Sequence, residues 1–252
     1  MLDQDYQFEN YPDALVPGSP LIAWNFAYRC FDYMYLVEKE PENSKLLEER
    51  MKLVSLPEKF RIYQKDANKV YSSIIEEIEE TASAHFFAFI DPYAFEVEWK
   101  TLERLLTSRV RGDFLILFQP RYIAMNVGSV LSGRVKEHNA LNKFFGDASW
   151  IDYLGKKRGA GQGIPEAALE YYVNKIKEVR KGRETIIEKV KIPLFDNTCY
   201  FLIFVTTRTM RGNPWMNTVI KLKNLIEKGN RRLVENAISC ILGKQQSILS
   251  YL

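Results

Sequence analysis

Three acidic residues each follow an apolar segment that is expected to form a strand. Glu38 ends "YMYLVE", Asp66 ends "FRIYQKD" and Asp91 ends "FFAFID". Ligands of open α/β sheets bind outside the carboxyl ends of the strands, near the point where the strand order reverses. We therefore expect these three carboxylates to line one crevice.

A nucleoside-type ligand suits three such acceptors. Glu38 would accept hydrogen bonds from the ribose hydroxyls, and Asp66 would accept from an exocyclic adenine amine, with backbone contacts from Ala67 and Asn68. Asp91 would face the reactive end of the ligand. A structural interpretation stays open for each acid. Glu38 begins the charged run "EKEPE", and Asp66 and Asp91 precede helices as N-caps, which contribute about 1 kcal/mol without any ligand.

The order of elements predicts the fold class. Expected strands at 33–40, 60–66, 86–91 and 113–118 alternate with helical patterns, and such alternation indicates βαβ units and a parallel sheet. The run 86–91 is apolar enough to predict a strand buried on both faces. Residues 120–182 are helical and more polar, and we interpret them as an insertion. The runs 185–195 and 199–207, joined by "DNT", predict an antiparallel hairpin.

Composition narrows the class of protein. The 252 residues are 46% apolar and 27% charged, with a net charge of +3. No apolar run approaches the roughly 18 residues of a membrane span, and the polar start "MLDQDYQFEN" is neither a signal nor a transit peptide. A cytoplasmic protein is therefore expected. The three cysteines and two histidines share no metal-ligand spacing, so no metal site is predicted.

Weaker signals receive structural interpretations. "GKKRGAGQG" (155–163) is the most flexible-looking stretch of the chain. Within it, "GAGQGI" (159–164) reads as a solvated linker, although contact of this basic loop with nucleic acid stays open. His85 and His138 are interpreted as structural, and Trp99, Trp150 and Trp215 as core.

Six segments follow one another as in a known family: "GSPLIAW" (18–24), "YLVEKEPE" (35–42), "YQKDAN" (63–68), "FFAFIDPYAFEVEWKTLERLL" (86–106), "NKFFGDASW" (142–150) and "CYFLIFVTTRTMRGNPW" (199–215). Together they resemble the three-Cys-motif partner proteins, a bacterial and archaeal family with a class I S-adenosylmethionine methyltransferase-like domain. The most specific pieces are the Asp-Pro-aromatic sequence and "FFGDASW".

This resemblance implies a Rossmann-like class I methyltransferase fold: a mostly parallel sheet with a C-terminal antiparallel hairpin and a helical insertion. Residues 1–119 would form the first part of the core, 120–182 the helical insertion or cap, and 183–252 the rest of the core. The implied partner is a three-Cys-motif protein, often described as radical-SAM-like, which itself carries the cysteines of the family's name.

The resemblance also implies S-adenosylmethionine as cofactor. It assigns the ribose to Glu38 and the adenine to Asp66, and the residues implied to bind the cofactor are Gly18, Ser19, Glu38, Lys39, Asp66 and Ala67. Asp91, Pro92 and Tyr93 take the place of the fourth methyltransferase motif, where methyl donor and acceptor meet. Amino-methylating relatives carry two prolines there, whereas this chain has one.

A second departure concerns the first strand and its glycine-rich turn. Family members have Asp-x-Phe-Ala-Gly-x-Gly before "GSPLIA", whereas this chain has only Gly18 in that region, so the first strand is missing or degenerate. Its loss would leave buried backbone groups unpaired, at a cost on the order of 1–3 kcal/mol each. Three explanations are open: truncation, a degenerate strand in "DYQFENY", or a strand donated by a partner. The first two are favoured.

Two functions compete. The first is an S-adenosylmethionine-dependent methyltransferase-like protein, which suits three carboxylates because methyl transfer needs alignment more than strong acid–base groups. The second is a non-catalytic interaction subunit, which the missing glycine loop favours. A nuclease would need clustered acids with a metal-binding lysine or histidine, and the sequence shows no such cluster.

Overall fold

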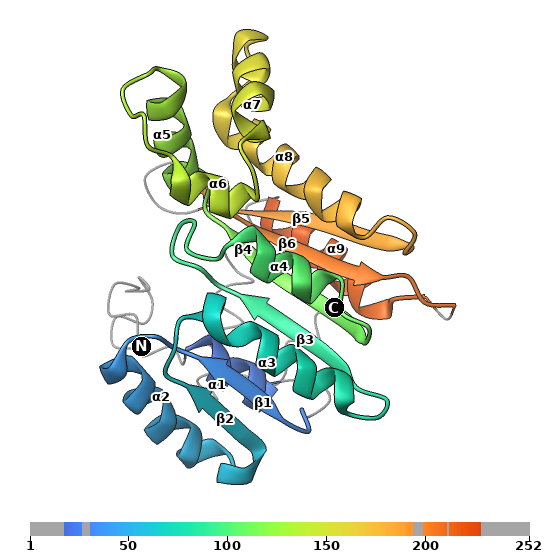
Figure 1. Cartoon of the computed structure of the whole chain (residues 1–252). Coiled ribbons are helices and arrows are strands. Elements are labelled where there is room, and N and C mark those ends of the chain that lie inside the picture. The colour runs from blue at the N-terminus through green and yellow to red at the C-terminus, as the bar shows by residue number, and fades with distance from the viewer. Residues whose placement is uncertain (1–17, 27–30, 194–198, 211, 228–252) are drawn as a thin grey trace, which may run out of the picture. The chain divides into compact units, whose positions relative to one another are not determined.

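The computed structural model describes residues 18–26, 31–193, 199–210 and 212–227 (Figure 1). The chain divides into two compact units, and each is described by itself. Of the described residues, 18–70 belong to the first unit and 71–227 to the second. The cysteines Cys30 and Cys240, the turn "DNT" and the segment "DYQFENY" lie outside the described residues.

The first unit is built around a two-stranded parallel sheet. Strands β1 (Met34–Val37) and β2 (Phe60–Tyr63) pair in register from Met34↔Phe60 to Val37↔Tyr63. Helix α1 (Ser19–Phe26) precedes them, and α2 (Pro41–Val54) with a short 3₁₀ turn (Pro57–Lys59) connects them. Leu36, Met51 and Phe60 form the buried core of this unit.

Helix α3 (Ala67–Glu80) leads from the first unit into the second. The second unit contains β3 (His85–Ile90), α4 (Trp99–Leu106), β4 (Arg111–Phe118), α5 (Pro120–Leu131), α6 (Asn139–Phe145), α7 (Ser149–Gly159), α8 (Ile164–Val179), β5 (Thr185–Pro193), β6 (Cys199–Thr207) and α9 (Pro214–Glu227). Proline opens α2, α5 and α9, where its missing N–H has no helical partner to lose. The segment predicted to be a helical insertion therefore carries the four helices α5 to α8.

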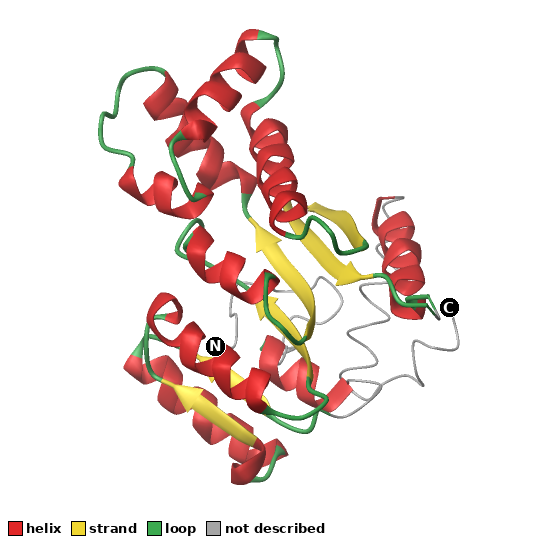
Figure 2. Cartoon of the chain, turned by 45° about the vertical axis from the view of Figure 1, so that its right-hand side comes forward, coloured by secondary structure: helices red, strands yellow, loops and turns green. Residues whose placement is uncertain are grey.

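The sheet of the second unit has the order β3-β4-β6-β5. Strand β3 is parallel to β4, whereas β6 is antiparallel to both of its neighbours (Figure 2). The predicted hairpin is confirmed: β5 and β6 pair along their whole length, from Thr185↔Thr207 to Pro193↔Cys199. A mixed α/β architecture follows, with parallel pairs in both units.

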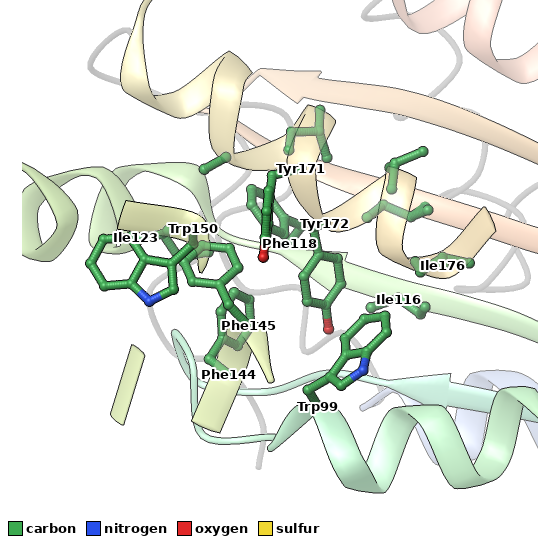
Figure 3. Close-up of a cluster of buried hydrophobic side chains, with 14 of the residues drawn as sticks. Trp99, Ile116, Phe118, Ile123, Phe144, Phe145, Trp150, Tyr171, Tyr172 and Ile176 are labelled. Carbon is green, nitrogen blue, oxygen red and sulfur yellow. The ribbon is translucent and has the colours of Figure 1, made fainter. Parts of the chain in front are cut away.

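The side chains of β6 alternate between two cores. Ile203 and Val205 join the large core with the helices α4 to α8. Leu202 and Phe204 pack on the other face, against Met216 of α9. Aromatic rings dominate the large core (Figure 3): Phe144 stacks on Tyr172 with centroids 4.9 Å apart, and Trp150 is fully buried. The core role expected of Trp99 and Trp150 is thus confirmed.

Two expectations from the sequence are wrong. Strand β3 is not buried on both faces, because Phe86, Ala88 and Ile90 pack on the core while Phe87 and Phe89 are exposed. It lies at the end of the sheet, and among the described residues it pairs only with β4. The stretch 155–163 was expected to be the most flexible of the chain, and this is wrong for its first part, because residues up to Gly159 complete α7. Residues 160–163, within the expected linker 159–164, connect α7 to α8.

A buried carboxylate joins the end of α3 to the start of β4. The Glu79 side chain is only 2% exposed. It accepts two hydrogen bonds from the guanidinium of Arg104, both 2.9 Å, and others from the Ser108 hydroxyl and the backbone and side-chain N–H groups of Arg109. The hydrogen bonds from Arg104 lower the pKa of Glu79 the most, and those from Arg109 and Ser108 add to this effect. Burial acts in the opposite direction, but the pKa stays far below its ordinary value.

Replacing Glu79 by glutamine is expected to lower the free energy of unfolding by roughly 2–4 kcal/mol, because Arg104 loses its charged partner at a buried site. The carboxylate is stabilising above the pKa of an unfolded glutamate, about 4.3, and this stability is lost as the pH falls below that value. Urea unfolding at pH 7 and pH 3 measures both effects. Glu80→Gln, at an exposed neighbour, is the control, and equal losses in the two variants would contradict the assignment.

Candidate functional site

Glu38 and Asp66 lie at the same edge of the first unit's sheet. Because β1 and β2 are parallel, the residues that follow them meet at one edge, and the Glu38 amide donates to the Tyr63 carbonyl at 3.0 Å. Each carboxylate uses one oxygen locally. Glu38 Oε1 accepts from the Glu40 amide at 2.9 Å, and Asp66 Oδ1 accepts from the Asn68 amide at 2.8 Å. Asp66 therefore caps α3, as one interpretation of the sequence predicted.

Of the other residues expected at the cofactor, Gly18, Ser19 and Ala67 lie at the starts of helices, and Lys39 lies in a loop. The Gly18 carbonyl accepts from the amides of Leu21 and Ile22, so Gly18 begins α1, and Ser19 is the first helical residue. Lys39 is exposed in the loop after β1, and Ala67 opens α3.

Asp91 lies in the second unit, directly after β3. The interpretation of Asp91 as a helix N-cap is wrong, because α4 begins only at Trp99 and Glu98 occupies the cap position. Although the residue as a whole is exposed, desolvation of its carboxyl group raises the pKa of Asp91. Pro92 is buried, whereas Tyr93 is exposed.

The loop after β3 is held by a residue that the sequence did not single out. Gln119 follows β4, and its amide group donates to the Pro92 carbonyl at 3.3 Å and accepts from the Ala94 amide at 3.4 Å. Ala94 has a φ of 55°, a left-handed conformation that costs a non-glycine residue about 1–2 kcal/mol. Such strain persists where the surroundings over-determine it, and it clusters at functional sites. Carboxyl ends of parallel strands share one edge, so the same reasoning applied to "DFLILFQ" would have found Gln119.

Tyr122 is a second residue that the sequence did not single out. It lies in the first turn of α5, and its ring centroid is 5.5 Å from that of Tyr93. The neighbouring Tyr122 hydroxyl raises the pKa of Tyr93. Asp91 and Tyr93 thus lie in the loop at the carboxyl end of β3, and Gln119 and Tyr122 lie directly after β4, at and inside the start of α5. This part of the second unit is the candidate site.

The segment "FFGDASW" (144–150) connects α6 to α7 and contacts Lys175 of α8. Gly146 has a φ of 93°, and a Cβ there would come within 2.5 Å of the Trp99 ring and 2.8 Å of Lys175 Nζ. The Lys175 ammonium donates to the Phe145 carbonyl at 2.6 Å and to Asp147 Oδ2 at 2.7 Å. It also lies 5.0 Å from the Trp99 ring centroid. Glycine is therefore required here for close packing as well as for backbone conformation.

A cavity of about 230 Å³ lies beside this segment and is lined by Asp147, Ser149, Tyr153, Tyr171, Asn174, Lys175 and Glu178. Its polar groups mostly bind one another: Ser149 Oγ lies 2.5 Å from Asp147 Oδ1 and 2.6 Å from the Tyr171 hydroxyl. Burial alone would raise the pKa of Asp147, but hydrogen bonds from Lys175 and Ser149 lower it to about 2. A carboxylate of such low pKa is a poor general base, so we interpret the cluster as structural.

Other side chains of interest have structural partners. His85 Nε2 lies 3.1 Å from Asp113 Oδ2, and the other oxygen of Asp113 accepts from the Thr206 hydroxyl. His138 Nδ1 lies 2.8 Å from the Lys136 carbonyl. Within the described ranges, no three His, Cys, Asp or Glu residues are grouped so that they could hold a metal ion.

Comparisons with known proteins assign no family to this chain. No protein-family model matches the chain, and no curated protein matches it. In the part of the chain that the structure describes, every helix is too short or too polar to cross a membrane.

Replacing Asp91 by asparagine is expected to raise the thermal midpoint at pH 7. The raised pKa means that the folded state disfavours the charged carboxylate, so stability falls as the pH rises from the unfolded pKa of about 3.9 through the higher folded one. Asparagine removes this effect, and its advantage should vanish in acid. Asp152→Asn, exposed on α7, is the control. A lower midpoint for Asp91→Asn at pH 7 would show instead that the carboxylate is stabilising.

Replacing Lys175 by methionine is expected to cost roughly 1–3 kcal/mol of unfolding free energy at pH 7, because the Phe145 carbonyl and one oxygen of Asp147 lose the mostly buried ammonium as donor. Asp147 stabilises the fold above the unfolded pKa of about 3.9, and this is lost as the pH falls through its folded pKa of about 2. The cost should therefore shrink between these values. Urea unfolding measures it, with exposed Lys177→Met as control. A cost independent of pH would contradict the charge pairing.

Proposed function

We propose that this chain is an S-adenosylmethionine-dependent methyltransferase-like protein that works with a three-Cys-motif partner. The observation that carries the proposal is the sheet of the second unit, in which the reversed strand β6 lies between β4 and β5 while β3 and β4 stay parallel. A parallel sheet that ends in such a hairpin is expected of the class I methyltransferase-like fold, which the sequence resembles. The Asp-Pro-aromatic loop lies at the carboxyl end of β3, where such sheets bind ligands.

The residues of the first unit fit the cofactor by the chemistry of their donors and acceptors. Glu38 and Asp66 follow adjacent parallel strands, and the local hydrogen bond of each engages one carboxylate oxygen. The second oxygens would accept from ribose hydroxyls and from the adenine amine. Gly18, Ser19, Lys39 and Ala67 would supply neighbouring contacts. The bound cofactor would supply a methyl group on a positively charged sulfur.

In this proposal the loop after β3 positions the acceptor. The Asp91 carboxylate would accept a hydrogen bond from an acceptor N–H and so orient its lone pair, and Tyr93 would contact the acceptor's face. Pro92 and Gln119 hold these two side chains in place through the backbone. Alignment of this kind is the main demand of a direct displacement at carbon.

One observation favours a second candidate, a non-catalytic interaction subunit. The Glu38 and Asp66 carboxylates each accept a hydrogen bond from the backbone amide two residues later, so each has a structural role that needs no ligand. The sequence also has a single glycine before β1, Gly18, in place of a glycine-rich cofactor turn.

Calorimetric titration with S-adenosylmethionine and with its demethylated product separates the two candidates. Asp66→Ser is the informative variant, because serine also caps helices but has no carboxylate. We expect binding to the wild-type chain and at least tenfold weaker binding to Asp66→Ser, with an unchanged thermal midpoint. Asp32→Ala, exposed before β1, is the control. Absence of binding to the folded chain, together with capture of a purified three-Cys-motif protein, would favour the interaction subunit.

A further inference from the structure

Arginine side chains gather at the end of the second unit's sheet that lies opposite the candidate site. The start of β4, the end of β6 and the start of β5 meet there, because β6 is antiparallel to both of its neighbours (Figure 1). Gln119 follows the other end of β4. Arg111 opens β4, and Arg180 and Arg183 lie between α8 and β5. We call these three side chains the arginine cluster.

Shared hydrogen-bond acceptors show that the three guanidiniums are neighbours. The Leu106 carbonyl, at the end of α4, accepts from Arg180 at 3.1 Å and from Arg183 at 3.4 Å. Thr207, at the end of β6, accepts from Arg180 through its hydroxyl at 2.6 Å and from Arg111 through its carbonyl at 3.2 Å. The arginine cluster is therefore compact.

The arginine cluster carries more positive charge than its surroundings balance. In the described part of the chain, every hydrogen bond from the three guanidiniums goes to a neutral hydroxyl or carbonyl oxygen. A helix end such as that of α4 contributes only about half of a negative charge. Asp113 also acts on Arg180, but its two oxygens are already bound by His85 and Thr206.

One of these charges is buried. Arg180 is 1% exposed, and desolvation together with the nearby charge of Arg183 lowers its pKa to about 10. Burial of a charge costs free energy unless a group of opposite charge compensates it. An anion bound beside the arginine cluster would supply that compensation.

Donor groups remain for such an anion. A guanidinium has five N–H groups, and the exposed Arg183 uses three of them on carbonyls at and after the end of α4. The buried Nε of Arg111 has no hydrogen-bond partner among the described residues. The Arg208 side chain, directly after Thr207, is 66% exposed, and its ion pair with Glu184 is long, at 3.9 Å. Exposed donors therefore lie beside a buried positive charge.

We propose that the arginine cluster, together with Arg208, binds a phosphate group. Arg183 and Arg208 would donate to its oxygens, and the buried Arg180 would act through its charge. Guanidinium groups suit this ligand because several N–H donors can reach the oxygens of one phosphate. The phosphate would belong either to a small phosphorylated ligand or to the backbone of a nucleic-acid strand. The site goes beyond the proposed function and shares no residue with it.

Two probes test the site and distinguish the two sources of phosphate. Calorimetric titration with inorganic phosphate, at an ionic strength held constant with sodium chloride, measures binding of a small anion. Fluorescence anisotropy of a labelled thymidine oligonucleotide measures binding of a strand. Binding of inorganic phosphate without the oligonucleotide would assign a small ligand. Binding of the oligonucleotide, with an affinity that falls steeply as salt is added, would assign a strand.

Variants connect the binding to the arginine cluster. Arg183→Gln should weaken binding by roughly tenfold or more, because a charged donor is lost. Arg208→Gln, which within the described residues breaks only the long ion pair with Glu184, should also weaken binding and should fold normally. Glu184→Gln removes the carboxylate that competes for Arg208 and should strengthen binding. Arg158→Gln, which removes the same charge at an exposed position of α7, should bind within about twofold of wild type.

The proposal would be overturned if neither probe bound the folded wild-type chain, or if Arg183→Gln and Arg208→Gln both bound as tightly as Arg158→Gln. Weaker binding by Glu184→Gln would also contradict it. For the oligonucleotide, loss of one phosphate contact should reduce the slope of log K against log salt by about 0.7. An unchanged slope in both Arg183→Gln and Arg208→Gln would show that the strand binds elsewhere.

Discussion

The hydrogen bonding of β4 on both sides is the constraint on which the second unit depends. One edge of β4 pairs with the parallel β3 and the other with the antiparallel β6, over registers from His85↔Arg111 and from Phe114↔Val205. Because its neighbours fix it on both sides, the residue that follows β4, Gln119, has a defined place beside the end of β3. The hydrogen bonds from Gln119 to the loop after β3 therefore depend on sheet pairing.

Charged side chains join the helices around this sheet. Glu79 is buried and bound by arginine and serine donors, and Asp147 is bound by Lys175 and Ser149, so in both cases a carboxylate is compensated by several donors at once. The Glu79 side chain is buried, and a buried charge is tolerated only with such compensation. Asp91 differs, because desolvation raises its pKa while no donor to its carboxylate has been identified among the described residues.

Much of the architecture could be predicted because the relevant patterns are local. The two apolar runs around "DNT" predicted the hairpin, and the alternation of strands and helices predicted the parallel pairs. The prediction for β3 was wrong because an apolar run does not reveal how many neighbours a strand has, and β3 lies at the end of its sheet. The expected flexibility of 155–159 was wrong because glycines at a helix end resemble those of a linker, whereas these residues complete α7 and Lys157 donates to Glu170 of α8.

The sequence by itself determined that this is an α/β protein whose acids Glu38, Asp66 and Asp91 follow three strands, because hydrophobic period and chain order suffice for that conclusion. Only the tertiary structure showed that Asp66 caps a helix, that Gln119 holds the Asp-Pro-Tyr loop, and that Tyr93 meets Tyr122 at the surface. These pairings join residues from different strands and helices. Their geometry depends on strand pairing and side-chain packing between elements distant in sequence, which no local pattern encodes.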